Sequence, residues 1–140
     1  MADSFALLHV HTEYSMLDGA SRLDEAIAAA VADGQPAMAI TDHGNMYGVL
    51  DFYRGCKDQG IKPIIGTEIY LAHESRHERP SRRGRADDSG GDTGGGKKLY
   101  YHLTLLAETD QGYRNLIQLA SLAVMEGYYY KPRMDWELLE

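Results

Sequence analysis

The sequence has one cysteine and no long apolar run in its 140 residues. With Cys56 alone, an intrachain disulfide is excluded, which fits a reducing compartment, and we expect that thiol to lie in a hydrophobic core. No apolar run approaches the roughly 18 residues that span a bilayer. The first residues also lack the basic start and long apolar core of a secretory signal. We therefore expect a cytoplasmic protein without a membrane partner.

Positive charge is also scarce, since 14 basic residues stand against 21 acidic ones and the formal net charge is −7. An acidic protein lacks the general attraction to nucleic acids that a basic one has. Half of the basic residues nevertheless fall within residues 72–98; they are Arg76, Arg79, Arg82, Arg83, Arg85, Lys97 and Lys98. The rest of the chain is strongly acidic, which suits a site that collects divalent cations and would suit plain solubility as well.

Residues 72–98 are rich in arginine, glycine and aspartate and have almost no large apolar side chains. Such a segment cannot bury enough apolar surface to offset the entropy of ordering it, so we predict a flexible, basic, glycine-rich surface insertion. Residues 90–98 faintly resemble a phosphate-binding loop. A lysine takes the Ser/Thr place and a strand is expected next, so a flexible linker is favoured. His73 and His77 are expected to be exposed and are left out of the candidate site.

Short apolar runs alternate with amphipathic stretches along the rest of the chain. The apolar runs predict strands at residues 5–10, 37–40, 62–71 and 99–107. Apolar residues at helical spacing predict helices at about 23–33, 46–59 and 110–126, with another beginning near Asp135. Ser21 and Asp24 have the spacing of a capping box, and Gly34 and Gly60 are expected to end the first two helices. This order favours an α/β fold with a parallel sheet.

The number of strand–helix units is small for a barrel. An eight-unit barrel typically takes about 250 residues, and this chain has room for about half of those units. The final helix is expected to have no C-terminal cap within the sequence. We therefore expect residues 1–140 to be the N-terminal part of a longer domain.

Side chains that can bind metal ions fall at or near the ends of the four predicted strands. Two histidines two positions apart on an extended segment point to the same face, and an aspartate in the following loop can reach the same place. A histidine follows the second strand, a glutamate lies in the third and a histidine in the fourth. These candidate residues are His9, His11, Asp18, His43, Glu68 and His102.

Taken singly, these residues have plainer interpretations. Two histidines near a strand end are mostly incidental, and a lone His102 in an apolar strand is more often a satisfied core histidine. Asp42 could bind a metal, orient an imidazole or cap the following helix. Glu68 lies between the apolar Ile65 and Ile69, where an unpaired carboxylate would be costly, so a metal or an imidazolium partner is expected.

Taken together, the candidate residues predict a multi-metal phosphoesterase site. Parallel α/β folds place their active sites at the carboxyl ends of the strands. Nitrogen and carboxylate ligands without thiolates suit Zn²⁺, Mn²⁺ or Fe²⁺. Clustered divalent ions suit the hydrolysis of phosphate esters, because they lower the pKa of water and hold both the attacking and the leaving oxygen.

The motifs His9-Val10-His11 and Thr41-Asp42-His43 resemble the first two motifs of the PHP (polymerase and histidinol phosphatase) superfamily. Longer stretches, residues 9–21, 40–72 and 100–123, resemble the N-terminal PHP domains of bacterial DNA polymerase III alpha subunits. The resemblance covers almost the whole chain except residues 72–98. It implies a distorted seven-stranded (βα) TIM-like barrel with parallel strands. It also implies up to three divalent metal ions (Zn, Mn or Fe), with the six candidate residues as ligands and catalytic groups and Glu68 bridging two ions.

The resemblance further implies a part of a DNA-directed DNA polymerase, a nucleotidyltransferase of DNA replication, whose PHP domain supports 3′–5′ exonuclease proofreading. DNA and other replisome subunits would be its partners, and the basic insertion could contact the DNA backbone. The family's last ligands, an Asp-x-His pair, and the polymerase palm lie beyond residue 140, so the site in this chain would be incomplete. A stand-alone phosphoesterase of the histidinol-phosphate phosphatase type and a non-catalytic structural PHP module are the alternatives.

Overall fold

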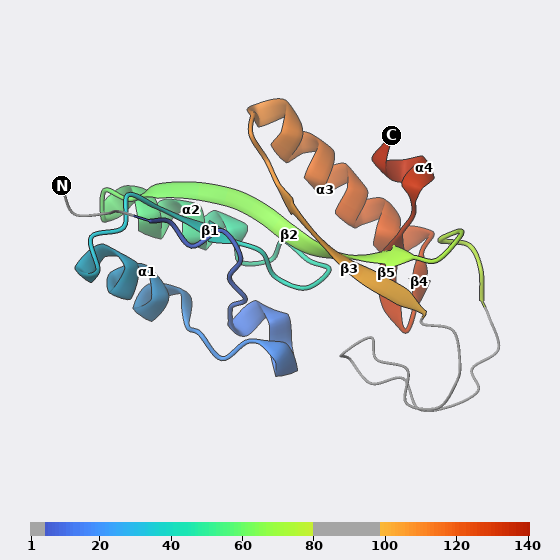
Figure 1. The fold of residues 1–140 in the computed structure, drawn as a ribbon, viewed down its shortest axis with the longest axis horizontal. Helices are drawn as coiled ribbons and strands as arrows, with labels where there is room; N and C mark the ends of the chain where they lie inside the picture. Colours follow the sequence, from blue (N-terminus) through green and yellow to red (C-terminus); the bar gives the residue numbers. More distant parts are fainter. Residues whose placement is uncertain (1–4, 80–98) are drawn as a thin grey trace.

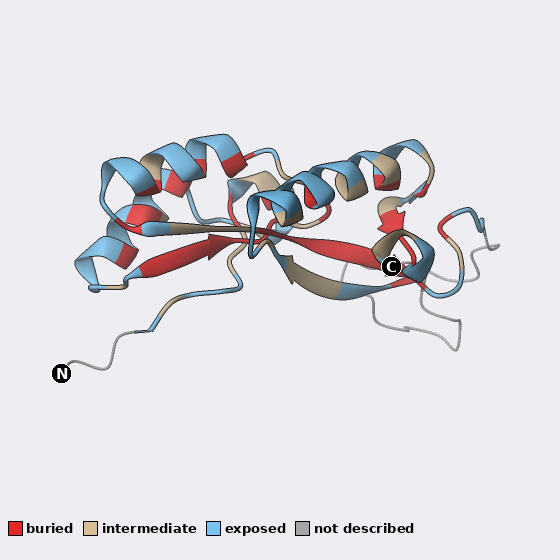
Figure 2. Ribbon diagram, turned by 90° about the horizontal axis from the view of Figure 1, so that it is seen from above, coloured by how far each residue is buried: buried red, intermediate tan, exposed pale blue. Residues whose placement is uncertain are grey.

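A twisted sheet with the long strand β2 (Lys62–Ala72) at its centre organises the chain in the computed structural model, which describes residues 5–79 and 99–140 (Figure 1). Helices α2 and α3 lie along one side of this strand (Figure 2). The remaining elements, in chain order, are η1 (Glu13–Asp18), α1 (Leu23–Ala32), β1 (Ala37–Ile40), α2 (Val49–Asp58), β3 (Tyr100–Leu106), α3 (Asp110–Met125), β4 (Tyr128–Tyr129), β5 (Lys131–Met134) and α4 (Trp136–Leu139).

The sheet is mixed, and this corrects the expectation of parallel strands throughout. β2 pairs in parallel with β1 and with β5, but it pairs antiparallel with β3, from Gly66 opposite Leu106 to Ala72 opposite Tyr100. A parallel connection usually needs a crossover helix of a dozen or more residues. The sequence between β2 and β3 has no helical apolar repeat that could supply one.

The apolar run at residues 5–10 lies beside β1 but is not a regular strand, which corrects the first predicted strand. It makes one isolated parallel bridge, between Leu7 and Met38. Near its end the hydroxyl of Thr41 accepts a hydrogen bond from the Val10 N–H at 2.8 Å and donates one to the Val10 carbonyl at 3.0 Å. These side-chain bonds supplement the backbone bonds that join the segment to β1, from the Ala39 N–H to the Leu7 carbonyl at 2.7 Å and from the Thr41 N–H to the Val10 carbonyl at 2.9 Å. The other predicted strands and helices appear near their expected positions.

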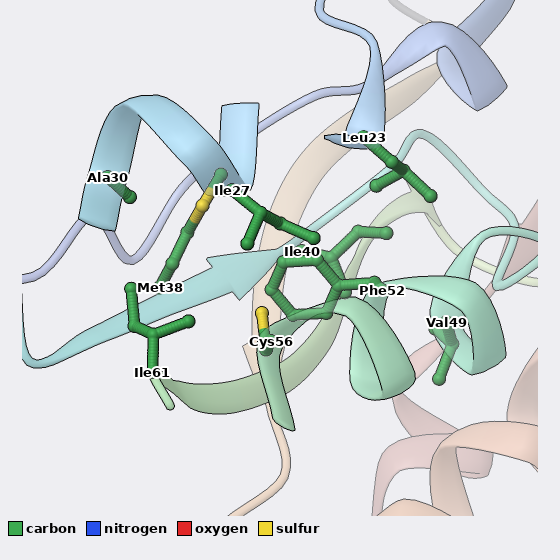
Figure 3. Close-up of a cluster of buried hydrophobic side chains, with 9 residues drawn as sticks. All are labelled: Leu23, Ile27, Ala30, Met38, Ile40, Val49, Phe52, Cys56 and Ile61. Carbon is green, nitrogen blue, oxygen red and sulfur yellow. The ribbon is translucent and has the colours of Figure 1, made fainter. Parts of the chain in front are cut away.

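A hydrophobic core joins α1, β1 and α2 (Figure 3). Its buried members are Leu23, Ile27, Ala30, Met38, Ile40, Val49, Phe52, Cys56 and Ile61. Cys56 is fully buried, as expected for a core thiol, and burial raises its pKa to about 11. A second cluster, with Ile69, Leu71, Ala123 and Met134 as its buried members, packs α3 against β2 and β5. The first core therefore packs against the start of β2, through Ile65, and the second packs against its end, through Ile69 and Leu71.

Helix α1 begins without the predicted capping box. Its N-cap residue is Arg22, which makes no side-chain cap hydrogen bond. The Leu23 N–H instead donates to Glu13 Oε1 at 3.3 Å, while the Ser21 carbonyl accepts from the Glu13 N–H at 2.9 Å. The backbone of Ser21 is thus paired with η1, and the cap of the helix comes from Glu13. At the other end the helix terminates before Gly34, whose φ of +75° is the left-handed conformation expected of a C-terminal glycine.

Residues 72–79 are ordered by buried polar contacts, so the prediction of a flexible insertion is wrong at the start of the segment. Arg76 is 8% exposed, and its guanidinium contacts the carboxylates of Asp135, Glu126 and Glu137 at 2.8–3.1 Å. Arg133, 1% exposed, donates to the carbonyls of Arg76 and Glu78 at 3.0 and 2.6 Å. We call these contacts the arginine clamp.

The rest of the expected insertion, including the glycine-rich residues 90–98, lies outside the described residues. His73 and His77 are exposed, as predicted. Within residues 5–79 and 99–140, no helix combines the length and the apolar character needed to cross a membrane.

Candidate metal centre

Asp42 anchors the loop that follows the first two histidines. Its carboxylate is buried, 1% exposed, at the end of β1. It accepts hydrogen bonds from the Thr12 N–H at 2.6 Å, the Thr12 hydroxyl at 2.8 Å and the Ser15 hydroxyl at 2.6 Å. The structure shows a role that was not among those considered from the sequence. The Asp42 carboxylate fixes the loop by accepting from the Thr12 backbone N–H and from the hydroxyls of Thr12 and Ser15.

His43 and Glu68 lie side by side because the chain continues in parallel register beyond β1. The Glu68 N–H donates to the Asp42 carbonyl at 3.0 Å, and the Gly44 N–H donates to the Glu68 carbonyl at 2.8 Å. The His43 N–H donates to the Ser15 hydroxyl at 3.1 Å, so the loop that Asp42 fixes also holds the His43 backbone. Gly44 turns the chain away with a φ of +62°.

The histidine–glutamate cluster consists of His9, His11, His43, Glu68 and His102. The carboxylate of Glu68, 5% exposed, lies at its centre. Its Oε2 accepts a short hydrogen bond from His9 Nε2 and lies 3.4 Å from His11 Nε2. Its Oε1 accepts a short hydrogen bond from His102 Nδ1 and lies 3.6 Å from His43 Nδ1. Each carboxylate oxygen therefore faces a different pair of imidazoles.

His102 reaches the cluster from an antiparallel strand. In the β2–β3 register His102 lies opposite Tyr70, and Thr104 lies opposite Glu68. Residues two apart on a strand share a face, so His102 and Glu68 are diagonal neighbours on the same face. The start of β3 lies beside the carboxyl half of β2, which is why His102 meets the other residues of the cluster although its strand runs opposite to the predicted direction.

The imidazole rings are packed closely enough to constrain their charges. His11 and His43 are stacked with ring centroids 4.1 Å apart and an interplanar angle of 6°. The rings of His43 and His102 meet edge to face at 5.2 Å. Two protonated imidazoles at such distances would repel one another. Within the described residues, the Nδ1 atoms of His11 and His43 are buried and have no hydrogen-bond partner.

The electrostatics favour an ionised Glu68 carboxylate and a neutral His43 imidazole. Burial, followed by the charge of His11, lowers the pKa of His43. Burial alone would raise the pKa of Glu68, but hydrogen bonds from His102 and His9 and the nearby charge of His43 hold it below its ordinary value. Deprotonated imidazole and ionised carboxylate are the forms that bind metal ions.

Five of the six predicted residues meet in two groups that share Glu68. One group is His9, His11 and Glu68, the other is His43, Glu68 and His102, and within each group the ligand atoms lie within 4.8 Å of one another. The structure does not bring Asp18 into either group. It is exposed at the end of η1, although its negative charge opposes, without reversing, the lowering of the His43 pKa by burial.

Sequence reasoning missed two residues beside the cluster. The ring of Tyr70 lies 5.2 Å from that of His102 and 6.0 Å from that of His43. Lys131 Nζ lies 5.3 Å from the centroid of the Tyr70 ring. A signal for Tyr70 existed, because it follows Glu68 by two positions and so shares its face. No local pattern pointed to Lys131.

Comparison with known proteins adds context to this geometry. Residues 8–140 match the model of the PHP domain family. The chain is 51% identical over 137 residues to the DNA polymerase III subunit alpha of Treponema pallidum, a match that covers 97% of this chain and 11% of that protein. It is 51% identical to the same subunit of Saccharopolyspora erythraea and 47% identical to that of Thermus aquaticus, covering 98% and 96% of this chain. The chain spans about a tenth of the length of these relatives.

Two solved structures share the fold at low sequence identity. One is an amidohydrolase from Chromobacterium violaceum, with a TM-score of 0.50 and 21% identity over 84% of this chain and 34% of the other. The second, from Bifidobacterium adolescentis, is a protein assigned as a metal-dependent phosphoesterase. It gives a TM-score of 0.52 and 16% identity over 87% of this chain and 35% of the other.

Proposed function

Because the chain belongs to the PHP domain family, we propose that it is the PHP domain of a bacterial DNA polymerase III alpha subunit, with a multi-metal phosphoesterase site that supports 3′–5′ exonuclease proofreading. The observation that carries the proposal is the position of Glu68, whose two carboxylate oxygens face two separate pairs of histidines. A carboxylate placed in this way is suited to bridge two cations.

The cluster has the donor set that divalent metal ions require. Four imidazoles and one carboxylate converge without a thiolate, which suits Zn²⁺, Mn²⁺ or Fe²⁺. Among residues 5–79 and 99–140, the buried Nδ1 atoms of His11 and His43 have no partner, a costly arrangement that a bound ion or a small shift of the ring would relieve. We assign His9, His11 and Glu68 to one ion and His43, Glu68 and His102 to another. Asp18 is proposed for a third, in keeping with its effect on His43.

The chain's own residues would position and tune the centre. Glu68 supplies the shared negative charge, and the hydrogen bonds to Asp42 keep the loop that follows His11 in place. When bound, the ions would supply Lewis-acid chemistry, activating water and neutralising charge on the phosphate ester. The proposed substrate is the terminal phosphodiester of a DNA strand.

For the fold, we propose the first part of a distorted seven-stranded (βα) TIM-like barrel. The low-identity structural matches support a shared fold, and β1, β2 and β5 supply the parallel strands. The antiparallel β3 is one way in which this barrel departs from a regular one. Residues 1–140 would then be an N-terminal piece of the polymerase chain.

We also propose DNA and other replisome subunits as partners, and the cytoplasm as the location. A role for the basic segment in contacting the DNA backbone rests on sequence alone, since most of that segment lies outside the described residues. Arg76 is excluded from such a role, because it is buried and contacts three carboxylates.

A non-catalytic structural module remains the second candidate, and one observation favours it. The short hydrogen bonds from His9 and His102 to Glu68 hold the cluster together by themselves. A stand-alone phosphoesterase finds less support, because the relatives at 47–51% identity are DNA polymerase III alpha subunits of about ten times this length.

Elemental analysis combined with a nuclease assay separates these candidates. The protein as naturally encoded should contain tightly bound divalent metal and should remove 3′-terminal nucleotides from single-stranded DNA. Glu68→Gln should lose most of the metal and the activity, while His73→Gln, at an exposed histidine outside the cluster, should keep both. A metal-free wild-type protein whose nuclease activity is insensitive to Glu68→Gln would establish the structural module instead.

A further inference from the structure

A tight turn holds Lys131 beside Tyr70, whose ring lies next to the histidine–glutamate cluster. β4 and β5 form a hairpin in which Tyr129 pairs with Lys131, so a single residue separates the pair. That residue, Tyr130, has a φ of +61°, a left-handed conformation that bulky side chains rarely adopt. Such backbone strain persists only where the surrounding structure requires it, and it is concentrated at functional sites. The turn fixes where the lysine side chain leaves the sheet.

Tyr70 provides a rigid base for that side chain. The Lys131 ammonium lies over the Tyr70 ring, 5.3 Å from its centroid, and also bonds to the Tyr70 hydroxyl. Tyr70 is 3% exposed, and its ring is packed against Gly44. A Cβ atom at Gly44 would lie 2.7 Å from Tyr70 Cε2, so only glycine leaves space for the ring in this position. The backbone at Tyr130 therefore positions Lys131, and the backbone at Gly44 leaves room for the ring of Tyr70.

The tyrosine connects the lysine to the group of ligands formed by His43, Glu68 and His102. Its ring contacts those of His102 and His43, at 5.2 and 6.0 Å between centroids. The negative charge of Asp18 acts on both Tyr70 and His43, so this edge of the site combines an acidic group with a basic one.

We propose that Lys131, supported by Tyr70, is the anion-binding arm of the site and contacts the non-bridging oxygens of the phosphodiester. The inference rests on the proposed function, since it assumes a phosphate ester as the substrate. The metal ions would neutralise charge at the reacting oxygens, and Lys131 adds a further positive charge beside Tyr70, whose ring lies next to those of His43 and His102. An ammonium on a flexible stem is a common phosphate ligand. When no substrate is bound, the cation–π contact with Tyr70 keeps the ammonium group near the site.

The test compares Lys131→Met, which removes the charge and keeps the length, with Lys131→Arg, which keeps the charge. Lys62→Met is the matched control, because Lys62 is an exposed lysine at the opposite end of β2 from Ala72. The naturally encoded protein, loaded with Mn²⁺, is titrated with inorganic phosphate in a calorimeter, and its metal content and hydrolysis of a single-stranded oligonucleotide are measured. Loss of a hydrogen bond to a charged group predicts that Lys131→Met weakens phosphate binding and lowers kcat/KM by roughly tenfold to a hundredfold.

The expected pattern is specific to an anion-binding role. Metal content should match the wild type in all variants, Lys131→Arg should recover most of the phosphate affinity, and Lys62→Met should behave as wild type. Unchanged phosphate affinity in Lys131→Met, or an equal loss in Lys131→Arg and Lys131→Met, would overturn the anion-binding arm while the proposed function stands. A wild-type protein that neither binds metal nor hydrolyses the oligonucleotide would overturn both.

Discussion

His11 and His43 stack face to face, with ring centroids 4.1 Å apart and an interplanar angle of 6°. They come from different segments, one before η1 and one after β1, and neither Nδ1 atom has a hydrogen-bond partner within the described part of the chain. The stack brings two titratable groups into contact at the point where the two halves of the cluster meet. The stability of the stack should therefore depend on the protonation of His43, whose pKa is lowered by burial and by the charge of His11.

The first prediction concerns pH in the absence of metal. Burial and the charge of His11 lower the pKa of His43 from its ordinary value of 6.5, so on acidification the unfolded chain takes up the proton first. The unfolded state binds more protons between the two pKa values, and stability increases with pH in that window. The free energy of unfolding should therefore fall as the pH falls below about 6.5, and should stop falling for this reason below the folded-state pKa.

Denaturant titrations in the presence of a chelator, between about pH 7.5 and pH 5, measure this slope. His43→Gln should reduce it, while His77→Gln, at an exposed histidine, should leave it as in the wild type. Glu68 acts in a separate window, since its lowered pKa makes its contribution present above the ordinary value of 4.5 and lost as the pH falls from there. An identical slope in His43→Gln and the wild type would contradict the role assigned to the stack.

Asp42→Asn should weaken metal binding although Asp42 contacts no ligand side chain directly. The carboxylate accepts three hydrogen bonds from Thr12 and Ser15, and an amide cannot accept all of them. We expect a loss of about 1.5–3 kcal/mol in the free energy of unfolding and roughly tenfold weaker metal affinity. Asp51→Asn, at an exposed position on α2, is the control. Equal metal affinity in the two variants would show that the loop holds its shape without Asp42.

Gly44→Ala should cost more than Gly34→Ala, although both glycines have left-handed backbones with φ of +62° and +75°. At Gly34 an added Cβ meets nothing within 4 Å, so only the backbone penalty of about 1–2 kcal/mol applies. At Gly44 the same atom would collide with Tyr70 and approach Pro132 Cγ to 3.0 Å. The difference in unfolding free energy between the two variants measures how firmly Tyr70 is held, and equal costs would show that the ring moves freely.

Arg76→Met should destabilise the fold without changing the metal content. It would leave the buried carboxylate of Asp135 without its guanidinium partner. We expect a loss of about 3 kcal/mol, the lower end for breaking a buried ion pair, because Glu126 and Glu137 keep contact with water. Arg54→Met, at an exposed position on α2, should be close to neutral. Loss of metal in Arg76→Met at temperatures where the protein stays folded would contradict the separation of the clamp from the cluster.

The grouping of the candidate ligands could be predicted in part from sequence, because it depends on local periodicity. Residues at i and i+2 on an extended segment share a face, which places His9 beside His11 without any knowledge of the fold. The direction of β3 could not be predicted this way, since alternation along a strand is the same whichever way the strand runs. His102 therefore lies in the cluster although its strand runs opposite to the predicted direction, and its role as a ligand stays a prediction.

The errors at Asp42 and Arg76 have a common physical cause. Each side chain is satisfied by partners distant in the sequence, Asp42 by Thr12 and Ser15, and Arg76 by Asp135. Composition made the segment around Arg76 look solvent-exposed, because a charged residue is normally buried only when it is paired. The pairing is tertiary information, and no pattern within a short window contains it.

Because of the arginine clamp, the stretch between residues 78 and 100 can change in length without altering the geometry of the candidate metal centre. It fastens residues 76–78 to β5 and to the start of α4, while β3 resumes pairing with β2 at Tyr100. The ends of the intervening stretch are thus fixed in space, and lengthening such a stretch costs only about 0.6 kcal/mol for each doubling. Evolution can therefore lengthen, shorten or recompose this part of the gene while Glu68 on β2 and His102 on β3 stay in register.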